Sequence, residues 1–155
     1  MIQTALELDF ADGTYLFDLK LPQLAELQEK RGCGVFKVYA RVLAGRYVIE
    51  DISVADTMQA EAFAEDLFET IRLGLIGGGR GEVDGKEVAV SAIGARRLVE
   101  RYCHAAPLRE SWAVAAAILG ARIEGYSPPG EADAGESPAS PATASTSDRS
   151  SPTAA

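Results

Sequence analysis

Long hydrophobic runs are missing from this 155-residue sequence. No stretch of about 18 apolar residues occurs without a charge, and no basic flank precedes an apolar block at the N-terminus. A membrane-spanning helix requires such an uncharged apolar stretch, and a secretory signal requires such a basic flank before an apolar block. The sequence therefore predicts neither, and we expect a cytoplasmic protein without a membrane partner.

Cysteine and histidine are also scarce. The two cysteines, Cys33 and Cys103, lie far apart and have none of the Cys-x-x-Cys or Cys/His spacings that hold zinc. The single histidine, His104, follows Cys103 directly, and consecutive helical residues point about 100° apart. A thiolate–imidazolium couple is therefore excluded for this pair. We expect no metal, no cofactor and no catalytic residue.

Positive charge is in deficit, since 15 basic residues face 23 acidic ones for a net charge of −8. This balance argues against a nucleic-acid partner, which requires a basic surface. A local exception is the basic cluster of Arg96, Arg97 and Arg101, with Arg109 as a candidate fourth member. Two alternatives stay open for it: ion pairs within the monomer, or contact with an acidic partner, including the acidic side of the 61–69 helix in another copy.

The glycine-rich stretch Gly74–Gly81 lacks the features of a phosphate-binding loop. It lies at the end of a predicted helix, where the dipole repels anions, and no Gly-Lys-Ser/Thr follows. Paired acids such as Glu65 and Asp66 occupy the polar face of the same helix without a histidine nearby. We interpret them as a solvated face rather than an acid/base pair or metal site.

Composition divides the chain into a folded domain at 1–126 and a tail at 127–155. The tail is rich in Ser, Pro, Ala and Thr and has no large apolar residue, so we expect it to be disordered. The folded domain begins with alternating apolar residues on both sides of Asp12-Gly13, a pattern that predicts a β-hairpin. A short extended link is expected over Tyr47–Ile52 and a polar loop from Val83 through Gly85 to Ser91.

Helical spacing of apolar residues predicts an α+β, mainly α fold, with the N-terminal β-hairpin packed on about five helices. The first two helices should fold back on each other, and the last should either pack on two sides or be offered to a partner. The first expected helix begins at Leu21 and ends at Gly32–Gly34, and the second runs from Val35 to just before Gly45. The third starts with a cap at Asp56 or Thr57 and ends at Gly77–Gly79. The fourth starts with a cap at Ser91 and ends before Pro107, and the fifth runs from Leu108 to about Ile123.

Four segments, in order and with similar spacing, resemble a family of small tail-morphogenesis proteins of gene transfer agents and related tailed phages. The resemblance covers roughly residues 5–126. The segments are DFADGTY at Asp9–Tyr15, LQEKRGCG at Leu27–Gly34, TIRLGLIGGG at Thr70–Gly79 and ARRLVERYCHAAPL at Ala95–Leu108.

The resemblance implies a role in building a phage-like tail. Members look like tail assembly chaperones, which bind the tape-measure protein, but the family has also been labelled a tail tube protein. A mainly helical, acidic domain with one short hairpin favours the chaperone, because tube subunits need more strands. The expected partners are the tape-measure protein, tail tube subunits or both, with a homo-oligomer also possible in principle.

The predicted partner-binding residues lie at the glycine-rich helix exit and on the basic helix. An equal alternative for the exit is that Leu75 and Ile76 fill the monomer's own core. Two further hypotheses are a small enzyme built from Asp56, Arg72 and Tyr102, and an adaptor module that uses the arginine face. The predicted partner-binding residues are Leu73, Leu75, Ile76, Gly77, Gly78, Gly79, Arg96, Arg97 and Arg101.

Overall fold

The computed structural model of the chain describes residues 2–49, 61 and 63–129. One compact unit extends from Gln3 to Tyr126. Its ends are joined by two backbone hydrogen bonds, from Gln3 N to Tyr126 O at 2.9 Å and from Tyr126 N to Gln3 O at 2.8 Å. The predicted disordered tail lies outside the described residues except for 127–129.

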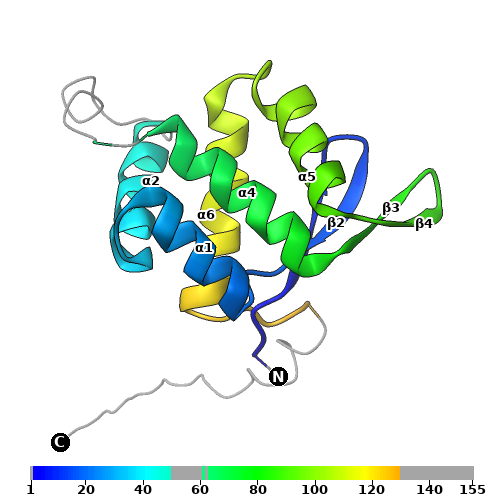
Figure 1. Cartoon of the computed structure of the whole chain (residues 1–155), viewed down its shortest axis with the longest axis horizontal. Coiled ribbons are helices and arrows are strands. Elements are labelled where there is room, and N and C mark those ends of the chain that lie inside the picture. Colours follow the sequence, from blue (N-terminus) through cyan, green and yellow to red (C-terminus); the bar gives the residue numbers. More distant parts are fainter. Residues whose placement is uncertain (1, 50–60, 62, 130–155) are drawn as a thin grey trace, which may run out of the picture. The chain divides into compact units, whose positions relative to one another are not determined.

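Two β-hairpins form a four-stranded antiparallel sheet in the order β1-β2-β3-β4 (Figure 1). The strands are β1 (Leu6–Phe10), β2 (Gly13–Phe17), β3 (Arg80–Val83) and β4 (Lys86–Ala89). The central pairing joins Thr14 to Glu82 and Tyr15 to Gly81, residues that are far apart in the sequence. The sheet is thus twice as large as the single hairpin that we expected.

The first hairpin turns one residue earlier than predicted. Phe10 pairs with Gly13, so Ala11 and Asp12 form the loop, and Ala11 takes the positive φ of 54°. Gly13 belongs to β2 instead. A Cβ atom there would lie 2.2 Å from the Glu82 carbonyl oxygen, so the glycine permits β3 to approach. The prediction of a hairpin is confirmed, but its turn residues were assigned wrongly.

The second hairpin replaces the predicted polar loop through Val83, Asp84 and Gly85. Asp84 and Gly85 have φ values of 53° and 77°, as a two-residue type I′ turn requires. The register agrees, since Val83 pairs with Lys86 across this turn. The prediction of a loop is wrong here, because the strands on both sides of the turn are only four residues long and partly polar and give a weak local pattern.

The fold class is confirmed: five α-helices and one π-helical turn accompany the sheet in the described part of the chain. The predicted Ser91 cap is also present, since its side chain accepts a hydrogen bond from the Gly94 amide at 3.0 Å. The helical elements are α1 (Leu21–Arg31), α2 (Val35–Ile49), α4 (Ala64–Gly78), α5 (Ala92–Leu98), η1 (Val99–Cys103) and α6 (Leu108–Ile123).

Three predictions about the early helices need correction. Helix α2 continues through Gly45 to Ile49, so the residues from Tyr47 to Ile49 are helical rather than extended. Helix α1 packs mainly against α4 and α2 mainly against α6, rather than chiefly against each other. Helix α4 begins only at Ala64, with Phe63 as its N-cap residue, so Glu61 precedes the helix; the predicted caps Asp56 and Thr57 lie outside the described residues.

Helix α4 lies at the centre of the fold, in contact with α1, α5, α6 and β2 (Figure 1). Helix α6 packs against both α2 and α4, which resolves its two alternatives in favour of internal packing. Within the described ranges, no helix has the length and hydropathy needed to cross a bilayer. The largest fully buried apolar side chains belong to Phe17, Leu19, Leu27, Val38, Val42, Leu67, Ile71, Leu73, Leu75, Ile118 and Leu119.

Candidate protein-binding site

The glycine-rich end of α4 packs inside the molecule. Leu73 and Leu75 are fully buried, and Ile76 is half-buried against the core. Gly77 and Gly78 lie within the helix, where a Cβ atom would come within 1.8 Å of the Asp18 carbonyl oxygen and 1.9 Å of that of Leu16. A partner would reach Leu73 and Leu75 only if the fold opened, which favours the alternative that this stretch fills the core of the monomer.

Gly79 lies just past α4 and ends it. This residue has a φ of 72° and donates its amide to the Leu75 carbonyl, as expected for a glycine at a helix C-terminus. The pattern therefore predicted the end of the helix correctly. The pattern did not reveal that Gly77 and Gly78 allow α4 to approach the backbone of β2 and of Asp18 closely.

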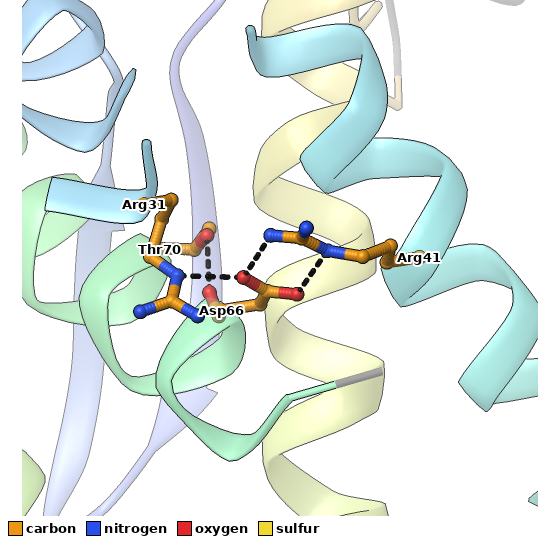
Figure 2. A network of polar contacts seen from close by, with 4 residues as sticks. All are labelled: Arg31, Arg41, Asp66 and Thr70. Carbon is orange, nitrogen blue, oxygen red and sulfur yellow. Dashed lines mark hydrogen bonds and ion pairs between the residues drawn. The ribbon is translucent and has the colours of Figure 1, made fainter. Parts of the chain in front are cut away.

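A buried carboxylate joins three helices (Figure 2). Asp66 lies in the first turn of α4 and is fully buried. Arg41 of α2 donates to both of its oxygens, from Nε at 2.8 Å and from Nη2 at 2.7 Å. Arg31, the last residue of α1, adds a third hydrogen bond from Nε at 2.7 Å. The arrangement fixes α1 and α2 to the start of α4.

The position of Asp66 corrects the prediction of a solvated acidic face, although the neighbouring Glu65 is exposed. The carboxylate raises the pKa of Arg41, which keeps the guanidinium charged. All of these groups bind one another, and the residues that the structure describes contain no cluster of three metal-binding side chains. We interpret the network as a structural connection between helices rather than a reactive site.

Arg72, which one hypothesis placed in an active site, is held by two carboxylates. Its Nη2 atom lies 2.7 Å from Glu69 of α4 and 2.9 Å from Glu26 of α1, and these hydrogen bonds raise its pKa. Tyr102 is on η1 and contributes to none of these contacts, and Asp56 is outside the described residues. Of the three residues of the enzyme hypothesis, the two that the structure describes, Arg72 and Tyr102, therefore share no contact and line no common pocket.

Cys103 and His104 lie in different environments. The Cys103 side chain is buried, and this burial raises the pKa of its thiol. His104 is exposed, and its ring lies 4.7 Å from that of Phe68. Burial keeps the thiol protonated and the imidazole packs on Phe68, so no contact of the described residues couples this pair for nucleophilic chemistry.

The basic cluster remains available for a partner. Arg96, Arg97 and Arg101 are all exposed, and none of them forms an ion pair within the part of the chain that the structure describes. By contrast, Arg41 of α2 and Arg72 of α4 are neutralised by carboxylates. Of the two alternatives for this cluster, the absence of internal pairs favours contact with another molecule.

A partly apolar groove runs beside two of these arginines. It has a volume of about 380 Å³ and lies between the second hairpin and the α5–η1 segment. Val83 and Val88 form part of its floor, and Leu98 contributes from α5. Arg97 and Arg101 complete its lining. We call this feature the hairpin groove; its residues are Asp12, Tyr15, Val83, Val88, Ala89, Val90, Gly94, Arg97, Leu98, Arg101 and Tyr102.

The groove exists because the sheet extends beyond its helical cover. Tyr15, Gly81 and Val88 stand opposite one another on β2, β3 and β4, so their side-chain positions share one face. Gly81 has no side chain, and a Cβ atom there would lie 2.4 Å from the Tyr15 ring. The second hairpin projects away from the helices (Figure 1), which leaves its valines only half-buried.

A π-helical turn forms the opposite side of the groove. The His104 amide donates to the Val99 carbonyl, five residues earlier, at 3.1 Å. Such turns insert one extra residue into a helical stripe and are frequent at functional sites. Here the turn carries Arg101 and Tyr102, which both line the groove. No local signal predicts this turn, since its apolar spacing is compatible with an ordinary α-helix.

Tyr15 makes the stability of this region sensitive to alkaline pH. Burial and the hydrogen bond from its hydroxyl to Asp12 raise its pKa above the ordinary value of about 10. The folded chain therefore retains this proton after the unfolded chain has lost it, and stability should decline above about pH 10. We expect the decline to be smaller in Tyr15→Phe. Urea unfolding of both proteins at pH 8 and at pH 10.5 measures the decline in the free energy of unfolding. An equal decline in the wild-type chain and in Tyr15→Phe would contradict the assignment.

Comparison with known proteins identifies similarity in the N-terminal part of the chain. Residues 3–55 match the family model described as phage tail tube protein, GTA-gp10. The matched region includes β1, β2, α1 and α2. No curated protein and no solved structure matches the chain. The family description concerns a structural protein of tails, and the match supports a relationship of this chain to gene transfer agent and phage tail proteins.

Proposed function

We propose that this chain is a structural component of a phage-like tail, close to or within the tail tube. The match of residues 3–55 to the tail tube family is the observation that carries this proposal. The hairpin groove is consistent with it, because a half-buried apolar surface beside arginines that have no ion pair among the described residues suits contact with another protein. The expected neighbours are other tail subunits.

Deletion of the gene tests the tail role. We expect cells that lack this chain to release heads without tails, or particles with incomplete tails, and we expect the wild-type gene to restore them. Negative-stain electron microscopy of purified particles measures the outcome. Tails of normal length and number in the deletion strain would overturn the proposal.

A second candidate is a tail assembly chaperone that binds the tape-measure protein and leaves before the particle is complete. The observation that favours it is the low strand content, since the longest strands have five residues and helices form most of the described chain. Ring-forming tube subunits rely on larger sheets. Co-expression with the tape-measure protein tests this candidate: a soluble complex supports it, and insoluble tape-measure protein without bound chain argues against it.

A further inference from the structure

The hairpin groove has a chemical character that selects its occupant. Its half-buried valines and Leu98 suit an apolar side chain, and Arg97 and Arg101, which form no ion pair with the described residues, suit carboxylates beside that side chain. The acidic group of the groove itself, Asp12, already accepts a hydrogen bond from the Tyr15 hydroxyl at 2.5 Å. An occupant therefore needs one large apolar group with acids next to it.

The chain carries such a feature on its own surface. Six large hydrophobic side chains are exposed in the described part of the chain: Ile2, Leu21, Phe36, Phe63, Ile93 and Leu108. Among these six, Phe63 alone has a carboxylate two residues away on each side, at Glu61 and Glu65. Both acids are exposed, and 45% of Phe63 is accessible to solvent.

Phe63 is held in this exposed position by the arginines of the Asp66 network. The guanidinium carbon of Arg41 lies 5.0 Å from its ring centre, and that of Arg31 lies 5.9 Å away. These cation–π contacts restrict the ring before any partner arrives, which lowers the entropy cost of binding. We call Phe63 with Glu61 and Glu65 the acidic knob.

The knob cannot reach the groove of its own chain. Phe63 precedes the first turn of α4, whereas β3 of the second hairpin begins two residues after the helix ends. The 15 residues of α4 span about 22 Å at 1.5 Å per residue. The hairpin side of the groove therefore lies toward the opposite end of the central helix from Phe63 (Figure 1). On the α5–η1 side, Glu65 shares a separate pocket with Val99, Glu100 and His104, and none of these residues lines the groove.

We propose that the hairpin groove binds the acidic knob of a second copy of this chain, so that copies associate head to tail. Phe63 of one copy packs on the valines of the next, and Glu61 and Glu65 face Arg97 and Arg101. A contact between two different surfaces is heterologous, so it forms a ring or an open filament rather than a closed dimer. This proposal concerns the purified chain and does not depend on the tail role.

The test uses two variants that each remove one surface. The groove variant carries Arg97→Glu and Arg101→Glu, and the knob variant carries Phe63→Ser and Glu65→Arg. Matched controls, Arg109→Glu and Glu29→Arg, change exposed residues outside both surfaces. Circular dichroism verifies that each variant is folded. Sedimentation velocity then measures association against the 16.4 kDa mass of one chain.

We expect the wild-type chain and both controls to associate with increasing concentration. Each surface variant should associate at least about 100-fold more weakly, because like charges then face each other in the contact. An equimolar mixture of the groove and knob variants should form a dimer of one of each. Such a dimer retains one intact groove–knob contact. It should not extend further, because its remaining knob has lost the Phe63 ring and still places Glu61 against the two new glutamates.

Three results would overturn the proposal. The first is a wild-type chain that stays monomeric at concentrations up to about 1 mM. The second is association of either surface variant as strong as that of its control. The third is a mixture of the two variants that stays monomeric. A normal deletion phenotype in the tail experiment would leave this proposal standing, because sedimentation measures the isolated chain.

Discussion

Asp66→Asn is expected to destabilise the protein by about 3 kcal/mol, since removing one partner from a buried ion pair leaves the remaining charges uncompensated. Asp66 is fully buried and accepts three hydrogen bonds from Arg31 and Arg41. The asparagine keeps the size of the side chain but loses the negative charge. Urea unfolding monitored by circular dichroism measures the change in the free energy of unfolding.

Glu65→Gln is the matched control for this substitution. Glu65 directly precedes Asp66 in the same turn of α4, and its side chain is exposed. The substitution therefore removes the same charge from the solvent-exposed side. We expect its effect to stay within about 0.5 kcal/mol. A double-mutant cycle with Arg41→Met should show a coupling energy of about 1–3 kcal/mol. Equal effects of the two acid substitutions would show that Asp66 does not hold the helices together.

Gly78→Ala is expected to destabilise the protein by about 3 kcal/mol or more, because overpacking against rigid backbone cannot be relieved by a rotamer change. The new methyl group would lie 1.9 Å from the Leu16 carbonyl oxygen and 2.5 Å from its carbon. Nearby, the Asp18 amide donates to the Gly74 carbonyl at 3.0 Å, so β2 cannot withdraw without losing this contact. Thermal unfolding of the variant measures the loss.

Gly34→Ala provides the control for added methyl groups. The nearest atom to its Cβ position is the Gln28 Oε1 atom at 3.9 Å, which is ordinary contact. Gly34 also has no positive φ, so an alanine is compatible with its backbone. We expect a change of less than about 0.5 kcal/mol. If both substitutions were tolerated equally, the close approach of α4 to β2 would be wrong.

Local signals in the sequence predicted the helices more accurately than the sheet. Gly32 ends α1 with a left-handed φ of 69°, and Ser91 caps α5, because both effects depend on residues a few positions apart. The second hairpin carries an Asp-Gly turn signal as strong as that of the first. It was missed because the flanking strands are short, and their pairing with β2 depends on residues far away in the sequence.

The candidate site was predictable only in part. The basic cluster was visible as a local reversal of charge, and Arg97 and Arg101 indeed line the groove. The groove itself depends on β3 and β4 extending past the helices, which no local pattern reveals. Asp66 and Glu65 look equivalent in the sequence, and they differ because α1 and α2 bring two arginines to one of them. Tertiary neighbours decide such cases.

The central claim, that this chain is a structural part of a phage-like tail, is tested most directly by quantitative mass spectrometry of purified particles. A chain that stays in the tail should be recovered in many copies per particle, in proportion to the known tail subunits. Complete tails that contain none of this chain, although the producing cells contain it, would contradict the claim.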